Sequence, residues 1–140
     1  MNARVLGVDP GGMTGVAMIK LPEMRLEDAY RLNQEEVFDM AFTLVGPVDL
    51  IGIERYVING NTARLSQQPT AMYVTGALMM AAQRTNVPVE FESMSDTKNS
   101  FPDTVLRQLD VWDSNEHVRD AIRCALLCAR RHGEVILPAV

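Results

Sequence analysis

The chain has few cysteines and lacks any long apolar run. Cys124 and Cys128 lie four residues apart, a spacing that suits two thiols on one helix face better than a disulfide framework. No stretch approaches the roughly 20 apolar residues of a membrane-spanning helix. The amino terminus also lacks a basic segment leading into an apolar one. We therefore expect a protein of a reducing cytoplasm with no membrane partner.

Basic residues are scarce as well. The formal net charge is −5 at pH 7, and Lys20 and Lys98 are the only lysines. This balance argues against a general nucleic-acid binder, because such proteins tend to be basic. The charge is uneven, however: acids crowd residues 23–54, whereas residues 55–89 hold three arginines and no acid. We expect this second stretch to be able to face an anion.

The sequence has no internal repeat, linker or low-complexity tract. With 140 residues, 47% of them apolar, it is long enough for one domain and too short for two, so we predict a single domain over residues 1–140. Apolar patterns and turn signals predict strands at 4–9, 13–19, 26–32, 48–54 and 87–91. They predict helices at 34–45, 62–84 (kinked or restarted at Pro69), 102–109 and 116–132. This order implies an α/β fold, a mixed sheet covered by helices.

Two predicted strands end alike, each in a single carboxylate. "VLGVD" ends at Asp9 and "LIGIE" ends at Glu54. One such acid would be explained as the cap of a turn or helix, but two favour a site. If the strands are parallel neighbours, both acids emerge at the same edge of the sheet. Two carboxylates brought together repel unless a cation lies between them, and oxygen ligands favour Mg²⁺ or Mn²⁺.

The last predicted helix adds two candidates. His117 and Asp120 are three residues apart and so share one face near the helix start. Each alone has an ordinary explanation. His117 could be a solvated or capping histidine, and Asp120 could interact favourably with the helix dipole. Together with the two strand-end acids they favour a functional site. Zinc binding by Cys124, Cys128 and His132 is rejected, because one helix cannot easily supply a closed tetrahedral site.

These motifs together resemble the RuvC family of Holliday junction resolvases, particularly the compact versions carried by bacteriophages. "VLGVDPGGMTG" is similar to the family's first strand and turn, with its catalytic acid at Asp9. "IGIERYV" places the second acid at Glu54, and "HVRDAIRCALL" places the last-helix motif at His117 and Asp120. Actin-like ATPases and sugar kinases share a motif of the first kind, but they need two such domains and a longer chain.

The resemblance implies an RNase H-like fold, with a mixed five-stranded sheet and helices on both faces. It also implies metal-dependent cleavage of Holliday junctions, with flaps and forks as further branched DNA substrates. Two Mg²⁺ ions per active site, for which Mn²⁺ can substitute, would be bridged by Asp9, with Glu54 on one and Asp120 on the other. His117 would bind a metal weakly or position the attacking water. Lys98, in "SDTKNS", lies where the family has a lysine near the scissile phosphate, although an ordinary loop lysine explains it equally well.

Branched DNA is the partner that the resemblance implies, and the cytoplasm would be that of a bacterial host if a phage encodes the chain. The residues predicted to contact DNA are Arg55, Tyr56, Arg64 and Lys98. Family members often have an aromatic residue three positions after the second acid, where this chain has Val57. Because Tyr56 is one place early, its role in opening a junction stays open.

The predicted helix at residues 62–84 has hardly a polar face between Ala71 and Ala82. A helix that packs only on its own sheet normally has a charged outer side, so we predict that it forms a homodimer interface. Two-fold pairing would suit a four-way junction. Two alternatives differ in class: a catalytically degenerate branched-DNA-binding or scaffolding protein of the same fold, and an RNase H-like nuclease with another nucleic-acid substrate.

Overall fold

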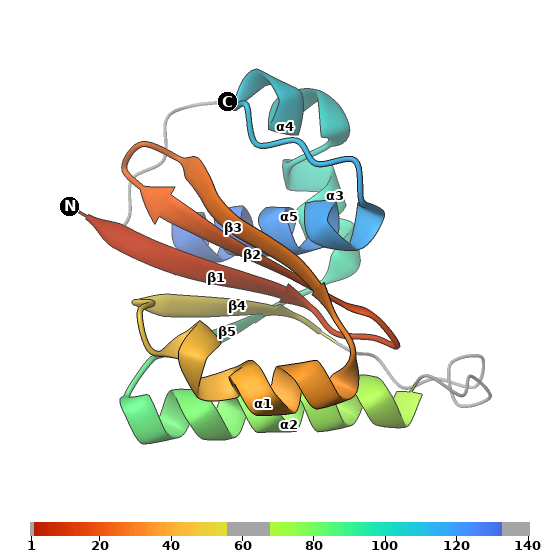
Figure 1. Cartoon of the computed structure of the whole chain (residues 1–140). Coiled ribbons are helices and arrows are strands. Elements are labelled where there is room, and N and C mark those ends of the chain that lie inside the picture. The colour runs from red at the N-terminus through yellow and green to blue at the C-terminus, as the bar shows by residue number, and fades with distance from the viewer. Residues whose placement is uncertain (1, 56–67, 133–140) are drawn as a thin grey trace.

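The computed structural model describes residues 2–55 and 68–132, which form a sheet between two layers of helices (Figure 1). The five strands are β1 (Ala3–Asp9), β2 (Thr14–Leu21), β3 (Arg25–Leu32), β4 (Leu50–Glu54) and β5 (Val89–Glu92). They lie in the order β3-β2-β1-β4-β5. The first three strands pair antiparallel, whereas β4 pairs parallel to β1 and β5 pairs parallel to β4. The predicted mixed five-stranded sheet is thus confirmed.

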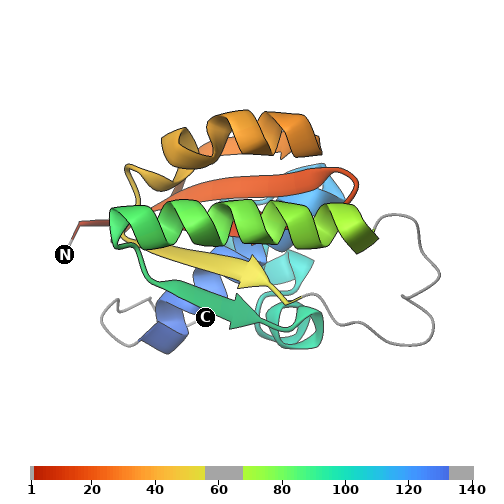
Figure 2. The same cartoon turned by 90° about the horizontal axis from the view of Figure 1, so that it is seen from below.

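Helices cover both faces of this sheet. The helices α1 (Gln34–Val45) and α2 (Gln68–Thr85) lie side by side on one face (Figure 2). On the other face lies α5 (Glu116–His132), next to the short helices α3 (Met94–Ser100) and α4 (Asp103–Gln108). Alternate strand residues therefore enter two separate cores, since successive side chains point to opposite faces. On β1, Val5 packs in the α5 core and Leu6 in the α1–α2 core.

Most predicted elements occur within one or two residues of the expected bounds, and the helix at 34–45 matches fully. The described part of α2 begins at Gln68, so the predicted start of this helix at residue 62 lies outside the described residues. No described helix has both the length and the apolar character needed to cross a membrane. The sequence prediction missed α3 entirely. This helix buries only Thr97, so it lacks the apolar periodicity by which a helix is recognised.

The helix α5 lies unusually close to the sheet, because glycines face it. A Cβ on Gly7 would lie 1.9 Å from the carbonyl oxygen of Ala121, and one on Gly15 would lie 2.1 Å from that of His117. Any larger residue would force the helix away from the strands. This close approach holds the start of α5 beside the carboxyl end of β1, where the candidate acids lie (Figure 1).

Candidate metal centre

Three carboxylates from distant parts of the chain meet at one edge of the sheet. Asp9 ends β1, Glu54 ends β4, and Asp120 comes from the second turn of α5. One carboxylate oxygen from each lies within 4.8 Å of the others. The parallel register of β1 and β4 causes this, since it pairs the residues just before Asp9 and Glu54. The structure thus brings together the three acids that were predicted to share a site.

The surroundings of this cluster oppose negative charge. Burial, together with the nearby charge of Asp120, raises the pKa of Asp9 to about 7. Burial and the charges of Asp9 and Asp120 raise the pKa of Glu54 to about 8. Among the described residues, Glu54 Oε2 is buried without a hydrogen-bond partner. Buried carboxylates of this kind need a compensating positive charge. The donor set is oxygen only and fits a hard divalent cation.

His117 lies beside the cluster, at the start of α5. Its Nδ1 is 3.2 Å from Asp9 Oδ2, and half of its side chain is exposed. The side chain of Asn115 begins the helix, because its Oδ1 accepts a hydrogen bond from the backbone N–H of Val118. The imidazole therefore contacts one of the three acids and still reaches solvent.

Lys98 lies on α3 and not on a loop, which corrects the loop alternative. Its charge lowers the pKa of both Asp9 and Glu54, so the ammonium group is close enough to act on the cluster. Arg55 follows β4 directly and is exposed, while its backbone N–H donates to the carbonyl of Glu92. The other two predicted DNA-contacting residues, Tyr56 and Arg64, lie outside the described residues.

Sequence reasoning missed three charged residues around the cluster: Glu92, its partner Arg131, and Arg123. Glu92 ends β5 and pairs in register with Glu54, so it carries the same signal of a strand ending in an acid. The Glu92 carboxylate forms an ion pair with Arg131, whose Nη1 lies 2.5 Å away, and Glu92 is not part of the three-acid cluster. Arg123 is buried and donates a hydrogen bond to Asp120. An arginine three residues after an acid, within an otherwise apolar helix segment, was the available signal.

Comparison with known proteins agrees with this architecture. No protein-family model matches the sequence, and no curated protein matches it. The fold is similar to RuvC of T. thermophilus in complex with a Holliday junction substrate, with a TM-score of 0.77, 16% identity, and coverage of 95% of this chain and 98% of that one. A second Thermus thermophilus RuvC structure has a TM-score of 0.69 at 17% identity, covering 94% and 98%. The chain therefore has a RuvC-like fold, and the predicted RNase H-like α/β class is confirmed.

Proposed function

We propose that this protein is a metal-dependent endodeoxyribonuclease that cleaves Holliday junctions and other branched DNA, including flaps and forks. One observation carries the proposal: Asp9, Glu54 and Asp120 converge within 4.8 Å at the carboxyl edge of a RuvC-like sheet. The similar RuvC structure contains a Holliday junction substrate. An acid cluster of this kind can hold metal ions that stabilise the attacking and leaving oxygens in phosphodiester hydrolysis.

The three carboxylates would hold the cofactor, which we propose is two Mg²⁺ ions, replaceable by Mn²⁺. Asp9 lies within the same 4.8 Å cluster as both other acids, and we assign it to bridge the two ions. Glu54 would bind one ion and Asp120 the other. Bound divalent cations supply positive charge at the scissile phosphate and make a bound water more acidic.

His117 and Lys98 would act on the substrate around this cluster. If His117 Nδ1 donates to Asp9, its Nε2 is left as a proton acceptor that can orient or deprotonate the attacking water. The Lys98 ammonium would bind a phosphate oxygen, since it already lies near two carboxylates that the phosphate would approach. We also assign Arg55 to the DNA backbone, together with Tyr56 and Arg64.

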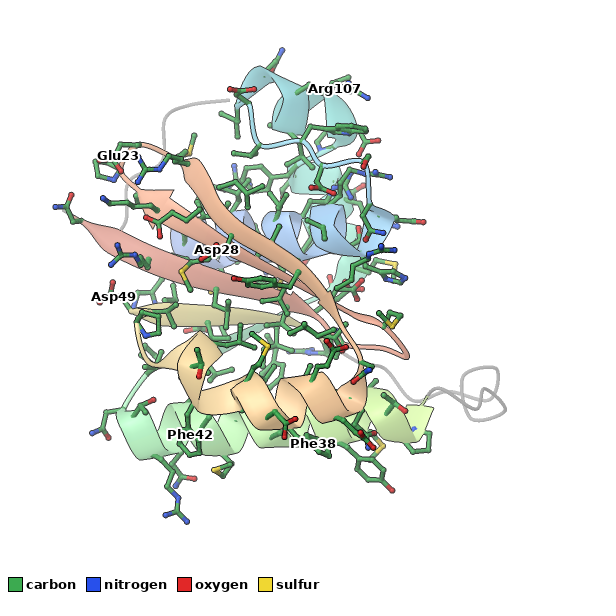
Figure 3. The ribbon with its side chains drawn as sticks, viewed as in Figure 1. Glu23, Asp28, Phe38, Phe42, Asp49 and Arg107 are labelled. Atoms are coloured by element: carbon green, nitrogen blue, oxygen red, sulfur yellow. The ribbon has the colours of Figure 1, made fainter. Side chains whose placement is uncertain are left out.

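We further propose a homodimer through the helix layer of α1 and α2. The outer side of this layer carries large apolar side chains that are 41–57% exposed. Two of them, Phe38 and Phe42, lie on α1 (Figure 3). The others are on α2: Met72, Tyr73, Met79 and Met80. Exposed apolar area of this kind is typical of the core of a dimer interface.

A cleavage assay tests the proposed function. Labelled four-way junction, flap, linear duplex and RNA–DNA hybrid are incubated with the protein, with and without Mg²⁺. We expect Mg²⁺-dependent cutting of the branched substrates and little cutting of linear duplex. Three variants each remove one ligand charge and should therefore abolish cutting: Asp9→Asn, Glu54→Gln and Asp120→Asn. Junction binding should persist in all three. Glu92→Gln is the matched control, a buried strand-end acid outside the cluster, and it should cut normally.

The alternatives give different results in the same assay. Junction binding without cutting in either metal would indicate the degenerate binding protein. Cutting of the RNA–DNA hybrid alone would indicate another substrate on the same fold. Robust cutting in the presence of a chelator would contradict the proposed role of the carboxylates.

A further inference from the structure

Arg123 is a buried arginine whose whole guanidinium group is engaged. Its side chain is only 7% exposed, on the face of α5 that turns toward α3 and α4. Nη1 donates to Asp120 Oδ1 at 2.8 Å, Nε donates to the carbonyl oxygen of Phe101 at 2.7 Å, and Nη2 contacts Asp103 Oδ1. A buried charge bound on three sides in this way is fixed in position.

The three acceptors belong to three different elements. Asp120 is on α5, Phe101 caps the carboxyl end of α3, and Asp103 begins α4. Because α3 also carries Lys98, one guanidinium group connects the acid of the cluster with the helix that holds the nearby lysine. A lysine could not replace it, since one ammonium group lacks the planar fork that meets separated acceptors together.

We infer that Arg123 is a positioning residue for the metal centre, which holds the Asp120 carboxylate in place for the cation. This inference rests on the proposed function. A carboxylate has two oxygens, and only Oδ1 of Asp120 bonds to Arg123, so the second oxygen stays available as a ligand. Hydrogen bonds to a ligating carboxylate fix its orientation, and loss of such partners typically lowers metal affinity by about 10- to 100-fold.

A purely electrostatic role would have the opposite effect. Arg123 brings a positive charge next to Asp120, one of the three acids that would bind cations, so its removal should tighten metal binding if charge alone mattered. Positioning and electrostatics therefore predict opposite directions for one measurement. This difference makes the inference testable without DNA and without turnover.

The test is calorimetric titration of the DNA-free protein with Mn²⁺ alone. We expect Arg123→Met to bind Mn²⁺ about 10-fold more weakly than the wild-type protein. Arg4→Met is the matched control, because Arg4 forms an ion pair with Glu27 at the opposite end of β1, and it should bind like wild type. Equal or tighter binding by Arg123→Met would overturn the inference. Wild-type protein that binds no Mn²⁺ would overturn the proposed function as well, which separates the two failures.

Melting in chelator shows whether Arg123→Met folds. If it does not, Arg123→Lys takes its place, since it keeps a positive charge in the buried position. We expect this variant to bind Mn²⁺ more weakly than wild type, because its ammonium group cannot bond Asp120 and the Phe101 carbonyl together. Wild-type affinity in Arg123→Lys would overturn the inference. As a second readout, excess Mg²⁺ should restore part of the lost cleavage rate, which a purely structural defect would not allow.

Discussion

At the scale of single residues, Asp9 and Glu54 determine how the metal-free protein responds to pH. Unfolded, they titrate at their ordinary values of 3.8 and 4.5, whereas burial and the neighbouring acids raise their pKa in the fold to about 7 and about 8. The folded state therefore binds more protons than the unfolded state between these values. The contribution of these two acids to stability is fully present below their pKa values in the unfolded chain. It is lost as the pH rises through their pKa values in the folded protein.

We expect the metal-free protein to melt at a lower temperature at about pH 8 than at about pH 5. Asp9→Asn should raise the melting temperature in chelator at the higher pH and change it little at the lower pH, because the amide needs no proton to stay neutral. Mg²⁺ should stabilise the wild type most at the higher pH. Calorimetry in chelator and in Mg²⁺ measures all three effects. A melting temperature independent of pH in chelator would contradict the raised pKa values.

Lys98 should act on the chemical step more than on binding. Its charge lies near Asp9 and Glu54, where a phosphate would gain negative charge in the transition state. We expect Lys98→Ala to lower the single-turnover cleavage rate about 100-fold and to change the junction Kd far less. Lys20→Ala, which alters the only other lysine of the chain, should leave both values unchanged. An unchanged cleavage rate in Lys98→Ala would contradict a role of Lys98 in the chemical step and indicate an ordinary surface lysine.

At the scale of elements, the contact between α5 and the sheet decides whether the site can form. Gly7→Ala would place a Cβ 1.9 Å from the Ala121 carbonyl and 2.8 Å from the Ala125 Cβ. We expect a loss of roughly 2–4 kcal/mol in unfolding free energy, in the range of severe overpacking. Gly76→Ala is the control, measured at a concentration where the protein is monomeric because Gly76 lies on the proposed dimer face. Nothing within the chain lies within 4 Å of a Cβ there, and the change should stabilise α2 by about 0.5–1 kcal/mol. Urea unfolding of both variants checks these opposite signs.

The elements also show what could be predicted from the sequence. Long apolar runs and periodic helices gave the strands, the helices α1 and α5, and the three acids of the cluster, because each leaves a local pattern. The helix α3 was missed because it buries one residue. Glu92 was missed because the predicted strand stopped at residue 91, one residue before the strand actually ends. Contacts between distant segments, such as Gly7 with Ala121, leave no local pattern.

At the scale of the whole molecule, the exposed face of α2 bears on the proposed homodimer. On α2 the exposed positions from Met72 to Met80 are apolar or glycine, which leaves a face without charge. We expect sedimentation at micromolar concentration to show a dimer, and Met79→Glu to produce monomers. Met94→Glu, at an equally exposed methionine on α3, should stay dimeric. A monomer at every concentration, with full junction cleavage, would contradict the dimer.

The position of α5 in the chain has a consequence for synthesis on the ribosome. This one helix covers most of a sheet face, and it comes after every strand of the sheet. A nascent chain that has produced β1 to β5 still exposes that apolar face until residues 116–132 leave the exit tunnel. Asp9 and Glu54 are then present without Asp120, so the three-acid cluster cannot form on the unfinished chain. A product released before α5 would expose this apolar face to proteases and chaperones, and it would lack one acid of the proposed cleavage site.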